Sequence, residues 1–264
     1  MGHDTITLSR VGKTFRRSRR TVRALSDIDL VIENGTFVTL FGPSGCGKST
    51  LLRIMAGLQD HDEGEVSLFG QTPRAAVRRK NIAWIPQSSA LLPWLSVRSN
   101  AALSTVVNRA ADRGEPAGRT SRDVGTVLAE LGLDDFGGAR PDQLSGGMRQ
   151  RAALARGFVH GAPLMLMDEP FSALDEFTRE SLRHRLLDVW ERHRKTVVLV
   201  THSAAEAVLM SDVIVVMTPR PGRVRAVVEV DLPRPRPRGI EDTAEFLGVV
   251  RRVKAELRAG WDGD

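Results

Sequence analysis

Residues 35–58, "GTFVTLFGPSGCGKSTLLRIMAGL", restrict the possible folds more than any other segment of the chain. The first part is an apolar run typical of a buried strand, and it leads directly into a glycine-rich turn. After the turn, leucine and methionine side chains recur at helical spacing, and Gly57 is placed to end that helix. A buried strand, a glycine turn and a helix in this order predict an α/β fold.

The turn itself, "GPSGCGKST", fits the pattern G-x-x-x-x-G-K-[ST]. Its glycines let backbone N–H groups turn inward around phosphates, and the N-terminus of the following helix adds the positive end of its dipole. Lys48 can reach the β- and γ-phosphates, and the Ser49 hydroxyl can bind Mg²⁺. A chance glycine-rich turn is the alternative, but the flanking strand and helix favour a nucleotide site. The predicted nucleotide-binding residues are Gly42, Pro43, Ser44, Gly45, Cys46, Gly47, Lys48, Ser49 and Thr50.

Two more motifs add chemistry to this site. "LMLMDEP" is an apolar strand that ends in two carboxylates, so Asp168 can reach a metal beside the loop and Glu169 can polarise a water. "LSGGMRQR" opens a helix in which Ser145 is placed as the N-cap and two glycines expose backbone N–H groups. Taken alone, these motifs are an exposed strand end and an ordinary capped helix. Together with the glycine loop they favour phosphate chemistry.

The rest of the chain reads as strands alternating with helices, which predicts a parallel sheet covered on both faces. "ALSDIDLVI" alternates apolar and polar residues and predicts an antiparallel strand near the N-terminus. Helical patterns fill residues from about 90 to 157, which we interpret as an inserted subdomain. The segment after residue 232 contains "PRPRPR", which predicts extended polyproline II structure at the start of a basic tail, residues 233–264.

Composition excludes several classes of protein. With 41% hydrophobic residues the chain can build a core, yet its apolar runs are far shorter than the roughly 20 residues that cross a bilayer. The N-terminal "MGHDTITLSR" lacks the apolar region of a secretory signal, and one cysteine allows no internal disulfide. The net charge of +6 comes from arginine clusters that suit nucleic acid or an anionic membrane face. A solvated arginine-rich surface is the interpretation we favour.

The motifs also occur together in one known family. "GPSGCGKST", Gln87, "LSGGMRQR", "LMLMDEP", "SALD" and His202 follow the order and approximate spacing of an ATP-binding-cassette (ABC) ATPase, over residues 5 to about 232. Within that family the chain most resembles the ATPase subunits of nitrate/sulfonate/taurine-type importers. The strings behind this finer resemblance are "LLPWLSV", "MDEPFSALDEFTR" and "MTPRPGRV". The resemblance implies a P-loop NTPase core with a parallel sheet, an N-terminal antiparallel β subdomain and an inserted helical subdomain, all within residues 1–232.

The resemblance implies a role for individual residues. Phe15 lies where the family stacks an aromatic ring on adenine, although core packing is the alternative. Gln87 matches a glutamine that touches Mg²⁺ and senses the membrane subunit, and His202 matches a histidine that contacts the γ-phosphate. Asp175 matches an aspartate that shapes the interface between two nucleotide sites. The implied catalytic residues are Glu169, His202, Lys48 and Gln87, and the implied Mg²⁺ ligands are Ser49, Gln87 and Asp168. Met148 departs from the glutamine that many members have after LSGG.

The implied function is ATP hydrolysis with Mg²⁺, coupled to uptake of a small anionic or sulfonate-like solute. Ser145, Gly146 and Gly147 are expected to close over the γ-phosphate held by a second copy of the chain, in a head-to-tail dimer with two ATP molecules. The other expected partners are integral membrane permease subunits and, indirectly, an external solute-binding protein, with the chain peripheral on the cytoplasmic face of the membrane. One alternative is a soluble ABC ATPase acting on nucleic acid or ribosomes. Another is a regulatory nucleotide-binding module without turnover, which the intact Glu169 and His202 disfavour.

Two segments lead to expectations of their own. In "LLPWLSV", residues 91–97, Pro93 removes a backbone donor and neither strand nor helix periodicity is present. We therefore expect an apolar patch of Leu91, Leu92, Trp94 and Leu95 that docks a helix of the membrane subunit, with burial in the core as the alternative. Cys46 lies within the glycine loop, so we expect maleimide to block the nucleotide site and MgATP to protect it.

Overall fold

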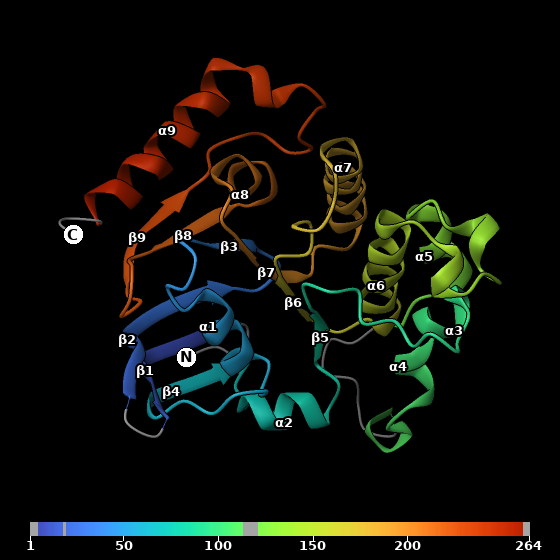
Figure 1. Cartoon of the computed structure of the whole chain (residues 1–264), viewed down its shortest axis with the longest axis horizontal. Helices are drawn as coiled ribbons and strands as arrows, with labels where there is room; N and C mark the ends of the chain where they lie inside the picture. The colour runs from blue at the N-terminus through green and yellow to red at the C-terminus, as the bar shows by residue number, and fades with distance from the viewer. Residues whose placement is uncertain (1–4, 18–19, 113–120, 261–264) are drawn as a thin grey trace. The chain divides into compact units, whose positions relative to one another are not determined.

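The computed structural model describes residues 5–17, 20–112 and 121–260 (Figure 1). The chain forms two compact units, Met1–Val77 with Thr196–Asp264, and Arg78–Lys195. Helix α2 (Pro73–Arg78) spans the boundary between them. The predicted helical insertion at about 90–157 lies inside the second unit, which begins before it and ends after it. Within the described residues, no helix is both long and apolar enough to span a membrane.

The first unit contains a small antiparallel sheet in the order β2-β1-β4. Its strands are β1 (Thr5–Arg17), β2 (Arg20–Glu33) and β4 (Glu63–Leu68). Ile6 of β1 pairs with Ile32 on one side and with Leu68 on the other, and all three side chains are buried. The sequence predicted β2 but not β1, because three register shifts interrupt the alternation of apolar and polar residues along β1.

A second sheet of the first unit places β3 (Phe37–Phe41) between two parallel neighbours, β7 (Thr196–Thr201) and β8 (Val213–Met217). Strand β9 (Val224–Glu229) pairs with β8 in the antiparallel direction. Every residue of β3 and β7 is buried, as expected for strands of a parallel sheet whose two faces are both covered. Helix α1 (Lys48–Met55) follows β3, and helix α8 (Ala204–Met210) joins β7 to β8. The predicted α/β architecture is therefore present.

The C-terminal segment is a packed part of the first unit. After a 3-10 turn at Ile240–Asp242, α9 (Ala244–Ala259) contacts α8, β8 and β9, as the red helix in Figure 1 shows. Its buried side chains are Phe246, Val250 and Val253, which recur at helical spacing along one face. We expected a basic tail over residues 233–264, and the structure instead has a helix with an apolar face in this segment.

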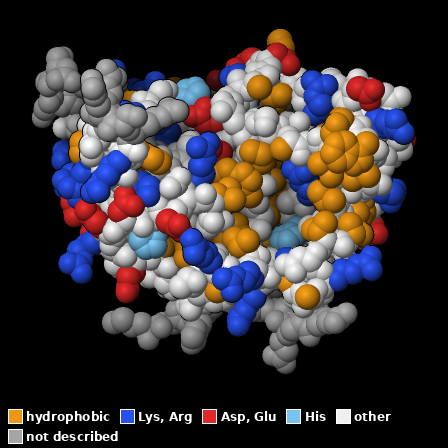
Figure 2. All heavy atoms as spheres, turned by 60° about the horizontal axis from the view of Figure 1, so that its bottom comes forward, with side chains coloured by type: hydrophobic (Ala, Val, Ile, Leu, Met, Phe, Trp, Pro, Cys, Tyr) orange, Lys and Arg blue, Asp and Glu red, His pale blue; other side chains and the backbone are white. Residues whose placement is uncertain are grey.

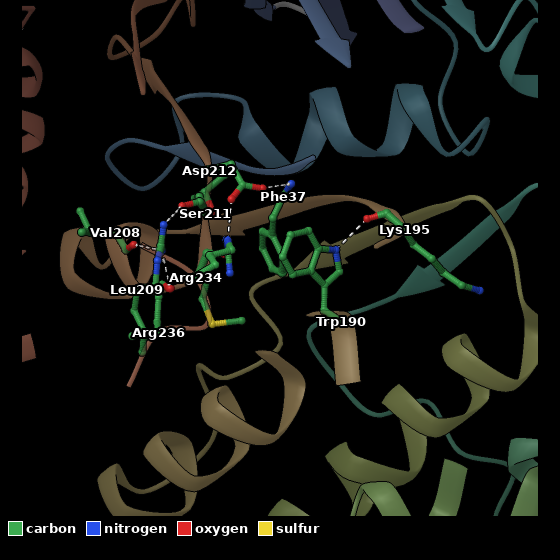
Figure 3. Close-up of polar contacts among 11 residues, drawn as sticks. Phe37, Trp190, Lys195, Val208, Leu209, Ser211, Asp212, Arg234 and Arg236 are labelled. Atoms are coloured by element: carbon green, nitrogen blue, oxygen red, sulfur yellow. Dashed lines mark hydrogen bonds and ion pairs between the residues drawn. The ribbon is translucent and has the colours of Figure 1, made fainter. Parts of the chain in front are cut away.

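Two arginines of the "PRPRPR" segment bind the end of α8 (Figure 3). Arg236 is only 6% exposed, and its guanidinium donates hydrogen bonds to the backbone oxygens of Val208, Leu209 and Ser211. Arg234 Nη2 donates to the backbone oxygen of Met210 at 2.7 Å, and its Nε donates to Asp212 Oδ1 at 2.6 Å. The last carbonyl groups of a helix have no partner within the helix, so these arginines satisfy them and complement the negative end of its dipole.

The second unit pairs β5 (Ile82–Ile85) with β6 (Leu164–Asp168) in parallel and surrounds α6 (Gly146–His160) with helices. Helix α6 contacts α3, α4, α5, α7 and β5, and the run from Ala152 to Ala155 along it is completely buried. The other helices are α3 (Val97–Ala101), α4 (Leu103–Val106), α5 (Val124–Glu130) and α7 (Glu176–His193). Short 3-10 helices lie at Arg109–Asp112, Asp134–Phe136 and Pro141–Gln143. Helix α6 is therefore the core of this unit.

The packing of α9 can be tested with two neighbouring residues. Phe246 is 1% exposed, whereas Leu247 is 46% exposed. Replacing Phe246 with alanine is expected to lower the free energy of unfolding by about 3–5 kcal/mol, because it removes a buried aromatic ring and leaves a cavity. Replacing Leu247 with alanine serves as the control, with an expected change of about 0.5 kcal/mol or less. Urea denaturation followed by circular dichroism measures both, and equal effects would contradict the packed helix.

Candidate functional site

The glycine loop of the first unit connects the buried end of β3 to the start of α1. Gly45 and Gly47 have φ angles of +78° and +103°, in the left-handed region that favours glycine. A Cβ atom on Gly47 would also lie 2.6 Å from Leu25 Cδ2 and 2.9 Å from Ala24 O. Any other residue at this position would therefore be strained and would clash with β2. The sequence pattern is realised as a tight loop that turns the chain into the helix.

Lys48 places its ammonium group on this loop. Its Nζ donates to the backbone oxygens of Gly42 and Pro43, each at 2.8 Å, and the residue is only 4% exposed. No acidic residue lies in the first turn of α1, so nothing in that turn neutralises the positive end of the helix dipole. A buried ammonium group and a free helix N-terminus together favour an anion, which fits the predicted phosphate site.

His202 leaves the sheet at the same edge as the glycine loop. Phe41, the last residue of β3, pairs with Thr201, the last residue of the parallel strand β7. The loop follows Phe41 and His202 follows Thr201, so both begin at the carboxyl ends of neighbouring strands. His202 is exposed, and the next residue, Ser203, is the N-cap of α8. The structure thus brings together the predicted residues of the first unit, the loop and His202.

A second group of predicted residues gathers in the second unit. Strands β5 and β6 are parallel, with Ile85 beside Met167, so Gln87, two residues after β5, and Asp168, the last residue of β6, lie at the carboxyl ends of adjacent strands. Gln87 Nε2 donates to Ser172 Oγ at 3.2 Å, and Ser172 Oγ donates to the backbone oxygen of Glu169 at 3.0 Å. Ser172 therefore links the glutamine to the backbone of the predicted catalytic residue. We did not predict this role, although a serine three residues after Glu169 suits such a turn.

The two carboxylates after β6 differ in their surroundings. Asp168 is buried, with 5% of its surface exposed, while Glu169 is half-buried. Glu169 also has a φ angle of +46°, a conformation that a non-glycine residue adopts rarely. Strained backbone of this kind costs about 1–3 kcal/mol and occurs often at functional sites, because the surrounding structure must hold it in place. The geometry therefore singles out Glu169 within the "DEP" motif.

The LSGG motif forms the start of α6, as predicted. Ser145 is the N-cap, and its Oγ accepts a hydrogen bond from Met148 N at 3.2 Å. Ser145 and Gly146 are exposed, whereas Gly147 is buried, and a Cβ at Gly147 would lie 2.3 Å from Thr178 Cγ2 of α7. The exposed end of a long helix without acidic residues in its first turn is suited to an anion.

Asp175 of the "SALD" motif caps the next helix, α7. Its Oδ1 accepts a hydrogen bond from Thr178 N at 3.0 Å, and this bond lowers the pKa of the Asp175 carboxyl below its usual value. Asp175 is exposed, so the capping contact leaves the other carboxylate oxygen accessible. This N-cap is a structural role for Asp175. Its role at the interface between two nucleotide sites stays a prediction.

Phe15 lies on the exposed side of β1, away from a core position. It is 40% exposed, and Lys13 Nζ lies 5.6 Å from the centre of its ring, within the range of a cation–π interaction. Lys13 Nζ also forms an ion pair with Asp62 Oδ1 at 2.8 Å, and the hydrogen bond from Lys13 lowers the pKa of the Asp62 carboxyl. The exposed ring favours the stacking prediction over core packing.

The segment "LLPWLSV" forms a turn that presents its tryptophan to solvent. Trp94 is 67% exposed, while Leu91, Leu92 and Leu95 are half-buried. Leu95 N donates to Leu92 O at 3.1 Å and closes the turn around Pro93. The segment is therefore partly anchored in the second unit, and its largest apolar side chain remains on the surface. This arrangement agrees with a partner surface and not with complete burial in the core.

Two polar side chains hold this turn from behind. Asn100 of α3 is fully buried, and its amide nitrogen donates to the backbone oxygens of Leu92, Leu95 and Ser96 at 3.0–3.1 Å. Arg156 of α6 donates to the backbone oxygen of Ala90 at 2.8 Å, and burial lowers the pKa of this arginine. These contacts connect the turn to the helix that begins with LSGG. We did not predict either residue, because their hydrogen bonds depend on the fold and not on a local motif.

Cys46 lies inside the loop and not at its entrance. The residue is 1% exposed, and its Sγ is 3.8 Å from Lys48 Nζ. A thiol must be reached by the reagent before it reacts, so this burial argues against rapid modification by maleimide in the folded chain.

We now predict that N-ethylmaleimide modifies the native protein at least about tenfold more slowly than the protein unfolded in guanidinium chloride, because the thiol is buried. MgATP should change the slow native rate little. Mass spectrometry measures this directly, since the chain has only one cysteine. Rapid modification of the native protein would contradict the buried position of Sγ.

Comparison with known proteins identifies the family. The model of the family described as "ABC transporter" matches residues 25–172. The chain is 40% identical over 256 residues to the aliphatic sulfonates import ATP-binding protein SsuB of Bacillus cereus, which covers 97% of each protein. It is 44% identical over 259 residues to SsuB 1 of Xanthomonas axonopodis pv. citri, which covers 98% of this chain and 97% of that protein. The chain belongs to the ABC transporter family, which confirms the resemblance drawn from its motifs.

Solved structures agree with this assignment. The dimeric structure of a post-hydrolysis state of an ATP-binding cassette bound to ADP and Pi has a TM-score of 0.72 and 30% identity, covering 86% of this chain and 100% of that chain. A second dimeric structure of a bacterial ABC transporter cassette has a TM-score of 0.71 at the same identity and coverage. These similarities confirm the predicted P-loop NTPase fold.

Proposed function

We propose that this chain is the ATP-binding and ATP-hydrolysing subunit of an ABC importer, and that it energises uptake of a small anionic or sulfonate-like solute through a membrane permease. The observation that carries the proposal is the loop between β3 and α1, with its left-handed glycines and the buried ammonium group of Lys48. The names of the relatives support the importer class, since two of them are aliphatic sulfonates import proteins.

In this proposal the chain catalyses hydrolysis by positioning and charge stabilisation. Lys48 binds the β- and γ-phosphates, Glu169 polarises the attacking water, and His202 contacts the γ-phosphate. Gln87 positions the water and senses the permease. The hydrogen-bonded link from Gln87 through Ser172 to the backbone of Glu169 supports a shared function for these two residues.

Mg²⁺ is the metal that we propose to accompany ATP. Among the described residues, no group of three or more His, Cys, Asp or Glu side chains is arranged to hold a metal ion. Magnesium in such enzymes is held by few protein ligands together with substrate phosphates and waters. The proposed ligands, the Ser49 hydroxyl, the Gln87 amide oxygen and the Asp168 carboxylate, are the hard oxygen donors that Mg²⁺ prefers. When bound, the ion would neutralise charge on the phosphates.

We propose a head-to-tail dimer with two ATP molecules as the active assembly. The exposed N-terminus of α6, with Ser145 and Gly146 at the surface, is suited to the γ-phosphate bound by a second copy. Gly147, the last residue of the LSGG motif, is buried against Thr178 of α7. The similar solved cassettes are dimeric, which supports the same assembly for this chain. ATP would then favour the closed dimer through its greater affinity for that state.

The permease subunits are the proposed membrane partners, and an external solute-binding protein would act through them. The chain would then lie on the cytoplasmic face of the membrane as a peripheral subunit. The exposed Trp94 supports a protein partner at that surface. On the face that Figure 2 shows, the lysine and arginine side chains of the described residues lie in small groups among acidic and hydrophobic ones.

The central test replaces Glu169 with glutamine, a change that keeps the size of the side chain and removes its charge. We expect ATP binding to be retained and turnover to fall by at least about a hundredfold, because water activation is lost. The ATP-bound dimer should then accumulate and be visible by size-exclusion chromatography.

Lys48→Ala provides the contrast to that variant. It should weaken ATP binding itself, because it removes charge from the phosphates. Calorimetric titration with ATP and a phosphate-release assay separate binding from turnover. Near-normal phosphate release by Glu169→Gln would exclude the proposed role of Glu169.

The partner surface is tested with Trp94→Glu. We expect unchanged folding and largely intact basal ATP hydrolysis, because the side chain is exposed and belongs to a turn held by other residues. Association with membranes of the native host and solute uptake should be lost, because a charge replaces the apolar centre of the contact.

Val31→Glu is the matched control, since Val31 is 65% exposed on β2 and the introduced charge is the same. Circular dichroism and membrane sedimentation of both variants measure the effect. An unfolded Trp94→Glu protein would mean that the turn belongs to the core, and equal loss of sedimentation in both variants would exclude a specific surface at Trp94.

A further inference from the structure

The turn that joins β8 to β9, residues 218–223, lies against the glycine loop. Arg220 extends from this turn, and its Nε and Nη2 atoms both donate to the backbone oxygen of Gly45, at 3.3 and 3.0 Å. These residues are separated by 175 positions in the sequence. The string "MTPRPGRV" that contains the turn resembles a feature of one importer group, and the proposed function gives it no role.

The turn is fixed in place on two sides. Gly222 N donates to Ala24 O at 2.9 Å, and Ser26 N donates to Gly222 O at 3.0 Å, so the turn is bound to the backbone of β2. A Cβ atom on Gly222 would lie 2.0 Å from the backbone oxygen of Cys46. The turn therefore fits between β2 and the glycine loop so closely that only glycine is accommodated. Arg220 is thus held by a rigid segment while its side chain reaches the loop.

A contact at the Gly45 oxygen restricts the peptide group between Gly45 and Cys46. The Gly45 oxygen and the Cys46 N–H belong to one peptide plane, so holding the oxygen fixes the rotation of that plane. Gly45 has a φ of +78° and no side chain, so its backbone is more mobile than that of other residues, and Arg220 adds to the restraint of the Cys46 N–H bond to Pro43 O at 3.4 Å. Each residue that the nucleotide must order reduces the affinity, because its conformational entropy is lost on binding.

We propose that Arg220 is a positioning residue that holds the glycine loop in the conformation that binds ATP. This inference rests on the proposed function, since it concerns the same nucleotide site. Arg220 acts through the Gly45 backbone and needs no contact with ATP. The alternative is that Arg220 merely adds positive charge near the site. Arg223 separates these two explanations, because it lies in the same turn and its Nη1 atom pairs instead with Asp27 Oδ2 at 3.3 Å.

The experiment compares three variants of the full chain, Arg220→Ala, Arg220→Lys and Arg223→Ala. Calorimetric titration measures the Kd for ATP, and steady-state assays measure KM and kcat. We expect Arg220→Ala to raise Kd and KM by about five- to tenfold, with kcat within about twofold, because a charge-assisted hydrogen bond to the loop is lost. Arg223→Ala should change Kd by less than about twofold, and Arg220→Lys should restore part of the affinity.

Each outcome has a definite meaning. Equal losses in Arg220→Ala and Arg223→Ala would overturn the proposal in favour of simple charge attraction. Wild-type affinity in Arg220→Ala would overturn it as well, while ATP binding by the wild-type chain would still support the proposed function. If the wild-type chain binds no ATP, the proposed function fails, and this inference fails with it. Should Arg220→Ala fold poorly, Arg220→Lys decides, because it keeps the charge and loses the paired geometry.

Discussion

The backbone of the loop between β3 and α1 imposes the constraint on which the first unit depends. Peptide groups that present N–H to an anion must direct their carbonyl groups elsewhere, and each carbonyl then needs a donor of its own. The structure supplies these donors from α1, which follows the loop, and from the distant turn between β8 and β9. Lys48 donates to the backbone oxygens of Gly42 and Pro43. Arg220 donates to that of Gly45, and Leu51 N of α1 donates to that of Gly47. The sheets around the loop can be understood as the frame that brings these donors to it.

In the second unit, the largely buried helix α6 supports two surface features, the LSGG motif and the turn that carries Trp94. Helix α6 begins with the exposed LSGG motif and continues through the core, where Arg156 reaches the backbone before the Trp94 turn. Asn100 holds the same turn from α3. A tryptophan on a rigid support loses little conformational freedom when it binds a partner, and this makes an exposed aromatic residue effective as an anchor. The proposed phosphate contact at LSGG and the proposed partner surface at Trp94 are therefore connected by one structural element, α6.

Much of the fold and of the site could be predicted from the sequence, because the relevant signals are local. The glycine loop, the DE pair and the LSGG helix start each occupy a few consecutive residues, and the structure has all three on the expected strands and helices. The family and fold are confirmed by the comparisons, while the roles of individual residues stay predictions. What we missed depends on contacts between distant residues. The hydrogen bond from Arg220 to Gly45 joins residues 175 positions apart in the sequence. The burial of the Cys46 side chain depends on the folded loop.

Strand β1 and helix α9 were missed for other reasons. Register shifts hide the period of β1. In α9 the apolar stripe from Phe246 to Val253 is present in the sequence, but it lies within a segment whose overall composition is basic. Composition averages over a segment, whereas packing depends on which face each residue occupies. Periodicity should therefore be examined even where charge predominates.

The arginine contacts at the end of α8 affect how much of the chain the folded domain requires. Helix α8 begins at Ala204, two residues after His202. Its C-terminal carbonyl groups accept hydrogen bonds from Arg236. A shortened chain that stopped at residue 232 would keep every recognised motif, yet it would remove the guanidinium group that secures this helix. The minimal folded cassette of this protein therefore extends beyond its last motif, to the arginine that binds the C-terminal carbonyl groups of α8.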